Sequence, residues 1–203
     1  MTADVIVIGA GPAGCAAGIR LAQMGYQVDV LEKRPLTERP DMTSGELLAP
    51  HTQQECDELG VELAGPWVCD RVHGVRNVYP DLSWTYHAFP EGFSYLQVDR
   101  GGFDAALQRR LLQVGAALHG EVRVTQIEPH PDRVVVLDAS GSRHEAKVAI
   151  DAGGRHAPTL TAFKLKREDP EFRQIAVALF FASFPDVRLD TWDRHLYGEH
   201  GAM

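Results

Sequence analysis

Cysteine is scarce in this 203-residue chain, and neither a long hydrophobic run nor a basic stripe is present. Its three cysteines, Cys15, Cys56 and Cys69, are too few and too scattered for a disulfide framework. The longest apolar run, at residues 175–182, is shorter than a bilayer span requires and predicts a buried strand. A net charge of −8 argues against a nucleic-acid surface. These features favour a cytoplasmic globular protein that has no cleavable signal sequence and no membrane span.

The beginning of the chain carries the most informative pattern. An apolar strand at 4–8 runs into Gly9-Ala10-Gly11-Pro12-Ala13-Gly14, and a helix at 12–24 and a second strand at 27–32 follow. In such a unit Gly9 permits the tight turn, Gly11 lets the backbone approach a pyrophosphate, and Gly14 lets helix and strand pack closely. The start of the helix offers free N–H groups and partial positive charge to phosphates. The pattern predicts a dinucleotide-binding βαβ unit.

The acid at the end of the second strand agrees with this reading. Glu32 lies about 20 residues past the glycines, where a ribose-binding acid is expected. Its carboxylate can accept hydrogen bonds from both ribose hydroxyls and would repel a 2′-phosphate. The alternative is a glycine-rich turn in an unrelated α/β protein. Agreement among strand, glycines, small helix residues and acid favours nucleotide binding.

Cys15 has two interpretations at this stage. A thiol at the beginning of a helix can be acidified and reactive. Alternatively, Cys15 is a small residue packed under the nucleotide. The second interpretation is favoured, because this helix position demands small side chains.

Periodicity and turn residues give a coarse outline of the rest of the chain. Helices are expected at 50–59 and at 100–115, the second one capped by Asp99. Strands are expected at 72–79 and 82–88 as a hairpin, at 95–98, at 122–128, 133–138 and 143–150 as an antiparallel set, at 174–184, and from 192 towards 197.

With these segments placed, the chain resembles a family of flavoproteins. Four passages carry the resemblance: the glycine pattern with Glu32, Ser44-Gly45-Glu46-Leu47-Leu48-Ala49-Pro50, Val98-Asp99-Arg100-Gly101-Gly102-Phe103-Asp104-Ala105-Ala106-Leu107, and Ile150-Asp151-Ala152-Gly153-Gly154-Arg155. They are similar to the FAD-dependent oxidoreductases of the glutathione-reductase-like class, in the branch of aromatic hydroxylases, geranylgeranyl reductases and flavin-dependent halogenases. The fold implied is α/β: a Rossmann-like FAD-binding βαβ unit with a central parallel sheet and an antiparallel β-meander, followed by the start of a β-rich substrate domain.

The resemblance also implies a set of FAD-binding residues. They are Gly9, Gly11, Pro12, Ala13, Gly14, Glu32, Lys33, Arg34, Ser44, Gly45, Glu46, Arg100, Val122, Asp151 and Gly153. Arg100 would reach a phosphate or the ribityl chain, although an ordinary surface arginine is the alternative. Val122, at the start of a strand, would border the adenine through its backbone. Asp151 would approach the FAD, although Asp followed by small residues is also plain turn chemistry.

Departures from the family pattern bear on the activity. The class has a second FAD motif containing a Gly-Asp pair, and no Gly-Asp dipeptide occurs in this chain. Halogenases of the class use a lysine after the Gly-Glu loop, whereas no lysine lies between Lys33 and Lys147. The expected function is therefore an FAD-dependent monooxygenase that hydroxylates a small organic substrate. The alternatives are a reductase of carbon–carbon double bonds, a halogenase, disfavoured by the absent lysine, and an FAD-binding fragment without turnover.

The predicted domain division follows the same resemblance. Residues 1–72 and 95–165 are expected to form the FAD-binding domain, and residues 73–94 and 166–203 the incomplete strands of a substrate domain. No second Gly-x-Gly-x-x-Gly follows a strand, so electrons would come from transiently bound NAD(P)H or through a partner flavin reductase. A homo-oligomer is possible. No residue is assigned to catalysis and none to metal binding, since no pair of histidines has convincing ligand spacing.

Overall fold

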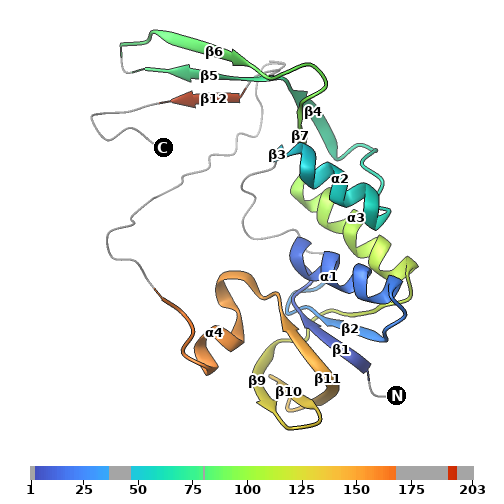
Figure 1. Cartoon of the computed structure of the whole chain (residues 1–203). Helices are drawn as coiled ribbons and strands as arrows, with labels where there is room; N and C mark the ends of the chain where they lie inside the picture. Colours follow the sequence, from blue (N-terminus) through green and yellow to red (C-terminus); the bar gives the residue numbers. More distant parts are fainter. Residues whose placement is uncertain (1–2, 37–46, 80, 168–191, 196–203) are drawn as a thin grey trace. The chain divides into compact units, whose positions relative to one another are not determined.

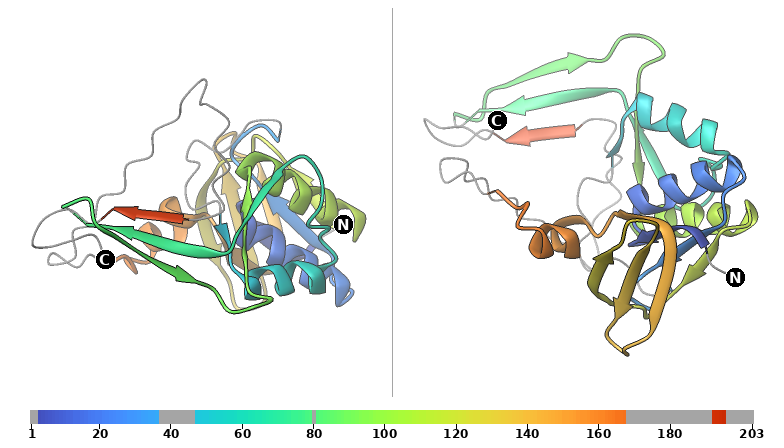
Figure 2. Two further views of the ribbon diagram at one scale, coloured as in Figure 1. Left: turned by 90° about the horizontal axis from the view of Figure 1, so that it is seen from above. Right: turned by 60° about the horizontal axis from the view of Figure 1, so that its bottom comes forward.

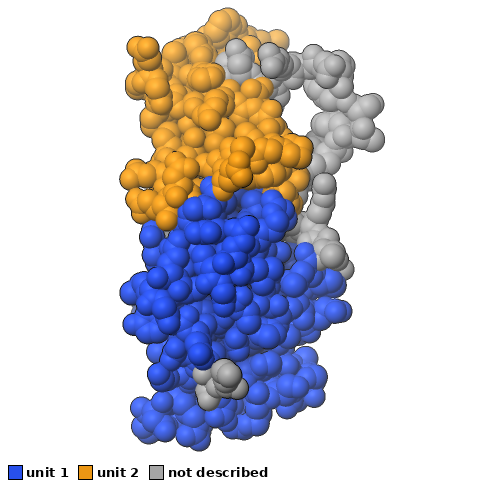
Figure 3. All heavy atoms as spheres, turned by 90° about the vertical axis from the view of Figure 1, so that its right-hand side faces the viewer, with its two compact units in different colours: residues 1–41, 59–61, 103–175 blue, residues 42–58, 62–102, 176–203 orange. Residues whose placement is uncertain are grey.

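The computed structural model describes residues 3–36, 47–79, 81–167 and 192–195 (Figure 1). The chain divides into two compact units, which Figure 3 distinguishes by colour. Unit 1 comprises Met1–Asp41, Leu59–Val61 and Phe103–Ile175, and unit 2 comprises Met42–Glu58, Glu62–Gly102 and Ala176–Met203. The predicted domain boundaries stay a prediction, because packing units need not coincide with functional domains.

Unit 1 is built on a six-stranded sheet of order β8-β2-β1-β11-β10-β9. Its strands are β1 (Ala3–Ile8), β2 (Val28–Leu31), β8 (Ala117–His119), β9 (Val124–Pro129), β10 (Val134–Asp138) and β11 (Arg143–Asp151). The pairs β8/β2, β2/β1 and β1/β11 are parallel, and β11/β10 and β10/β9 are antiparallel. The predicted combination of a central parallel sheet and an antiparallel meander is confirmed.

The composition of β1 explains its central place. Val5, Ile6, Val7 and Ile8 are all buried, so the strand has apolar side chains on both faces, as parallel strands covered on both sides do. Helix α1 (Pro12–Gln23) packs against β1 and β2, and the helix and both strands can be followed from two directions in Figure 2. Strand, helix and parallel strand thus form the predicted βαβ unit.

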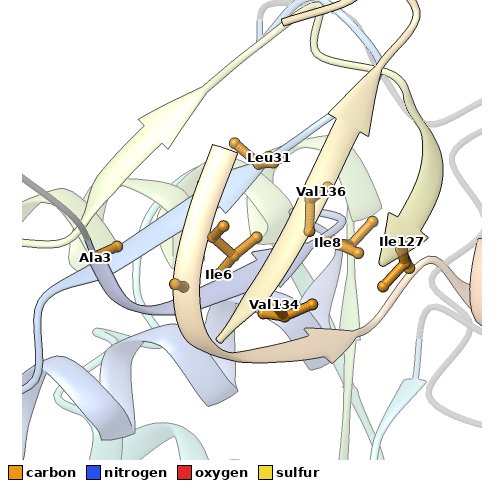
Figure 4. Packing of buried hydrophobic residues seen from close by; sticks show 8 residues of the cluster. Ala3, Ile6, Ile8, Leu31, Ile127, Val134 and Val136 are labelled. Carbon is orange, nitrogen blue, oxygen red and sulfur yellow. The ribbon is translucent and has the colours of Figure 1, made fainter. Parts of the chain in front are cut away.

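A cluster of buried apolar side chains joins β1 and β2 to the antiparallel meander. Ile6, Ile8 and Leu31 pack there with Val134 and Val136, and Figure 4 shows these side chains converging from β1, β2 and β10. The meander therefore closes part of the core of the parallel sheet. In β10 the consecutive residues Val134, Val135 and Val136 are all buried, so this strand is covered on both faces.

Three expectations for unit 1 need correction. The strand expected at 122 begins at Val124, because the N–H of Val122 donates to the Glu32 carbonyl at 2.8 Å and keeps this segment beside β2. Strand β8 was not expected, since its three residues are too few to show alternation. The short helix α4 (Pro158–Ala162), which follows the 3₁₀ turn Gly154–His156, was also missed.

Unit 2 contains two small sheets. One has the order β3-β7-β4, from β3 (Leu47–Leu48), β7 (Tyr95–Val98) and β4 (Val68–Val72). The other has the order β12-β5-β6, from β12 (Trp192–His195), β5 (Gly74–Val78) and β6 (Trp84–Ala88). The predicted hairpin corresponds to β5 and β6, which pair antiparallel. The start of the last expected strand is present as β12, whereas the strand expected at 174–184 lies outside the described residues.

The expected strand at 72–79 is in fact divided between the two sheets. Strand β4 ends at Val72 and pairs with β7, and β5 begins at Gly74 and pairs with β6. The change of partner falls at His73, whose carbonyl accepts the N–H of Phe89 at 2.8 Å.

Two helices begin in unit 2 and continue past its boundary in the sequence. They are α2 (Pro50–Leu59) and α3 (Arg100–Gln113), close to the predicted ranges. The expected cap of α3 is confirmed, because the Asp99 carboxylate accepts the N–H of Gly102 at 2.9 Å. Within the described residues, no helix combines the length and apolar character needed to cross a bilayer.

Candidate functional site

The candidate site lies at the carboxyl ends of the parallel strands of unit 1. Residues 9–14 follow β1, residues 32–34 follow β2, and residues 152–153 follow β11. In the sheet, β2 flanks β1 on one side and β11 flanks it on the other. Open α/β sheets bind ligands in this place, where successive connections leave in opposite directions.

The glycines of the first turn have different reasons to be glycine. A Cβ on Gly14 would lie 1.8 Å from the carbonyl oxygen of Gly9, so the chain itself demands glycine there. A Cβ on Gly11 would meet no described atom within 4 Å, and its φ of −73° suits any residue. The open space at Gly11 is therefore available to a group from outside the chain. This fits the predicted close approach of a pyrophosphate.

The start of α1 has the character of an anion site. Pro12 is the first helical residue, and no side chain of the described residues caps the preceding Gly11. The first turn contains no acidic residue. The first backbone N–H groups of a helix lack partners within the helix and carry partial positive charge. Both properties suit a diphosphate placed against Gly11.

Glu32 is one of two buried acids in the described part of the chain. One carboxylate oxygen, Oε2, accepts the N–H of Ala10 at 2.8 Å. The other, Oε1, accepts the backbone N–H of Arg34 at 3.1 Å and its Nε–H at 3.2 Å. Glu32 thus ties the end of β2 to the glycine turn. The sequence predicted the acid but not this connection, because Ala10 is 22 residues away along the chain.

Both backbone polar groups of Ala10 are held by hydrogen bonds. Its N–H is bound by Glu32, and its carbonyl oxygen accepts the Cys15 thiol at 3.3 Å and the Gln108 amide at 3.4 Å. Gln108 comes from α3, so three elements fix the turn that precedes α1. Sequence reasoning missed Gln108, and a polar residue on a helix gives no sign of such a distant partner.

Cys15 is the packed residue that the sequence favoured, not a reactive thiol. Its side chain is fully buried, and burial raises its pKa to about 12, with Asp104 and Glu32 adding to the effect. The nearby helix N-terminus does not overcome the loss of hydration. The thiol therefore stays protonated near neutral pH and donates to Ala10.

The two residues predicted at the end of β11 are part of a closed turn. The Asp151 carboxylate accepts the N–H of Gly153 at 2.9 Å and the N–H of Thr159 at 2.8 Å. It therefore links the turn to the start of α4. A Cβ on Gly9 would lie 2.7 Å from the carbonyl oxygen of Ala152, so the two loops approach each other closely. These contacts match the turn interpretation of Asp151, and its contact with FAD stays a prediction.

The remaining predicted residues have varied positions. Pro12 and Ala13 form the start of α1, and Lys33 is exposed beside Glu32. The N–H of Val122 donates to the Glu32 carbonyl at 2.8 Å. Arg100 is the first residue of α3, in unit 2. Ser44, Gly45 and Glu46 lie outside the described residues. Cofactor contacts of all these residues stay predictions.

Comparison with known proteins identifies a family for the part of the chain that contains this site. The model of the family described as lycopene cyclase protein matches residues 4–177, which include the glycine turn, Glu32 and the β11 turn. The chain belongs to this family. Among curated relatives, a 1H-pyrrole-2-carbonyl (peptidyl-carrier protein) chlorinase of Pseudomonas fluorescens is 30% identical over 89% of the chain and 46% of that protein. A digeranylgeranylglycerophospholipid reductase of Methanosarcina mazei is 31% identical over 79% of the chain and 41% of that protein.

A solved structure agrees with this placement. The flavin-dependent halogenase CmlS is 26% identical, with a TM-score of 0.68 over 81% of the chain and 31% of that protein. The chain is therefore similar to FAD-dependent oxidoreductases, in the branch that holds flavin-dependent halogenases and the geranylgeranyl-type reductases. The chain spans less than half the length of each of these three proteins.

Proposed function

We propose that this chain binds the adenosine diphosphate half of FAD at the carboxyl edge of its parallel sheet. The pyrophosphate would lie against Gly11 and the start of α1, and the ribose against Glu32. The observation that carries the proposal is the open space at Gly11 beside an uncapped helix start, with a buried carboxylate near the same turn. FAD, when bound, supplies the hydride and oxygen chemistry of the reaction.

The chain's own residues would prepare this site before the cofactor arrives. The N–H of Ala10 is bound by Glu32 and its carbonyl by Cys15 and Gln108, so the turn has little freedom left to lose on binding. A site ordered in advance binds more tightly, because less conformational entropy is lost.

Flavin uptake by the purified chain tests the cofactor proposal. The expected result is recovery of FAD, identified by its visible absorbance and by the mass of the released molecule. Recovery of NAD, with no uptake of flavin on reconstitution, would exclude the proposal.

For the activity of the whole protein, we infer a monooxygenase that hydroxylates a small organic substrate. The absence of lysine between Lys33 and Lys147 supports hydroxylation over halogenation. Electrons would come from NAD(P)H, bound transiently or through a separate flavin reductase.

Two other reactions have support of their own. Similarity to the chlorinase and to CmlS favours halogenation, in opposition to the missing lysine. Similarity to the reductase of Methanosarcina mazei favours saturation of a carbon–carbon double bond. Each of the three reactions gives a product of different chemical composition.

Turnover by the full-length protein separates the three reactions. The protein is supplied with reduced flavin, oxygen and candidate aromatic or isoprenoid substrates, with and without chloride or bromide. The expected product carries one added oxygen atom whether or not halide is present. A halogenated product would establish the halogenase, and a hydrogenated product whose formation does not require oxygen, as shown by an anaerobic repeat of the assay, would establish the reductase.

A further inference from the structure

The buried carboxylate of Glu32 has a definite number of places for hydrogen-bond donors. A carboxylate offers about four acceptor positions, roughly two on each oxygen. The backbone N–H of Ala10 occupies one position on Oε2, and the backbone N–H of Arg34 occupies one on Oε1. Both donors are fixed by the fold. One position on each oxygen is left, which matches the two neighbouring hydroxyls of a ribose.

One of the two remaining positions is filled by a side chain. The Nε–H of Arg34 donates to Oε1 at 3.2 Å. No further donor to Oε2 lies within hydrogen-bond distance among the residues that the structure describes. The free protein therefore presents one open acceptor position and one that Arg34 occupies.

The hold of Arg34 on Glu32 is suited to exchange. The guanidinium reaches the carboxylate through Nε alone, without the two-pronged geometry of the strongest arginine–carboxylate pairs. Its side chain is 26% exposed, while that of Glu32 is 8% exposed. Water can hydrate the guanidinium as it leaves, and the carboxylate stays in place on its two backbone donors.

We propose that Arg34 is a specificity-determining residue of the ribose site, because its Nε–H fills the position that one ribose hydroxyl takes in the complex. Binding of an adenosine nucleotide exchanges this donor for the hydroxyl. The hydroxyl therefore contributes less to the binding free energy, because the hydrogen bond from Arg34 is lost when the hydroxyl binds. This inference rests on the proposed nucleotide binding and adds a role for Arg34 that contact with the cofactor alone does not include.

Two substitutions separate the donor from the charge. In Arg34→Gln, the side-chain amide nitrogen occupies the same place along the side chain as Nε and keeps an N–H donor without the charge. Arg34→Met has similar length and no donor. Lys33→Met is the charge-matched control, since Lys33 is exposed and, in the described part of the chain, the Glu32 carboxylate is bound by Ala10 and Arg34 rather than by Lys33.

The measurement is the dissociation constant of each protein for ADP, 2′-deoxy-ADP and 3′-deoxy-ADP, by calorimetry or NMR titration. The ratio of the dissociation constant for each deoxy-ADP to that for ADP measures how much the missing hydroxyl contributes to binding. In Arg34→Met we expect this ratio to rise about threefold or more for at least one of the two analogues. The acceptor position is then empty in the free protein, so the hydroxyl gains a hydrogen bond without displacing one. Arg34→Gln should keep the wild-type ratio. Lys33→Met should change binding of all three ligands by the same factor.

Each other outcome has a distinct meaning. Equal ratios in Arg34→Met and wild type would overturn the exchange proposal while leaving nucleotide binding intact. A ratio in Arg34→Gln that rises as in Arg34→Met would also overturn it, since charge and not the donor would then decide. Absence of ADP binding in the wild-type protein would overturn both this inference and the proposed function. Circular dichroism of each variant verifies that the fold is retained.

Discussion

At the residue scale, Glu32 holds the glycine turn through Ala10, and contact with the ribose is the second task that we propose for it. Glu32→Ala should lower the free energy of unfolding by about 1–3 kcal/mol, because the buried N–H of Ala10 loses its acceptor. Glu32→Gln keeps one acceptor oxygen and should recover most of that stability. FAD should bind both variants more weakly. Denaturant unfolding and flavin titration measure the two effects, and full stability in Glu32→Ala would contradict the coupling.

The three cysteines should differ in reactivity because they differ in burial. Cys69 is exposed, whereas Cys15 and Cys56 are buried and burial raises the pKa of both thiols, to about 12 for Cys15. Iodoacetamide at pH 8 should therefore label Cys69 in the native protein well before Cys15. Mass spectrometry of tryptic peptides gives the order. Labelling of Cys15 at the rate of Cys69 would show that the thiol is reactive after all.

Asp138 gives a pH-dependent contact at the turn between β10 and β11. Hydrogen bonds from the Ser140 hydroxyl and from His144 hold the pKa of its carboxyl well below the usual range. Because the folded pKa is lowered, this contribution to stability is fully present above the unfolded pKa of about 3.9. It is lost as the pH falls from there through the folded pKa. Ser140→Ala removes the largest cause and should raise the Asp138 pKa in an NMR titration, and an unchanged value would contradict this assignment.

At the scale of elements, two glycines of the strand-turn-helix unit serve different purposes: Gly14 is required by the fold, and Gly11 is expected to be required by the ligand. Gly14→Ala should lower the free energy of unfolding by at least about 3 kcal/mol, because the new methyl group overlaps the Gly9 carbonyl. Gly11→Ala should change it by less than about 1 kcal/mol, since the space there is open and its φ is ordinary.

Flavin titration completes this matched pair. Gly11→Ala should bind FAD about tenfold more weakly or worse, because its methyl group enters the space assigned to the pyrophosphate. Normal affinity in a well-folded Gly11→Ala protein would place the pyrophosphate elsewhere.

At the scale of the whole molecule, the hairpin of β5 and β6 exposes large apolar side chains. Trp84 is 61% exposed and Tyr86 is 44% exposed, both on β6, which is an edge strand of its described sheet. Exposed apolar edge strands favour association with another chain. We therefore expect the 203-residue chain to self-associate as its concentration rises.

Sedimentation velocity tests this expectation. The double variant Trp84→Thr and Tyr86→Thr should shift the distribution towards monomer. Tyr26→Thr is the control, because Tyr26 is an exposed aromatic residue outside the hairpin. A monomeric wild-type chain at every concentration, or an equal effect of the control, would contradict a role for the hairpin.

The sequence by itself determined the βαβ unit, the antiparallel meander and the place of Glu32. These features depend on local signals: a continuous apolar strand, glycines at fixed spacing, and alternation with period two. The packed state of Cys15 was also predictable, because the demand for small residues at that point of the helix is part of the same pattern.

The tertiary structure alone decided the contacts that join distant parts of the chain. Strand β8 exists because three residues pair with β2, and α4 is tied to the β11 turn by Asp151. Glu32 accepts the N–H of Ala10, and Gln108 of α3 donates to the carbonyl of the same residue. Such bonds leave no periodic trace in a sequence, because each depends on one donor and one acceptor brought together by the packing of separate elements. The acceptor positions of Glu32, and with them the place of Arg34 in the proposed ribose site, are formed only when those elements have come together.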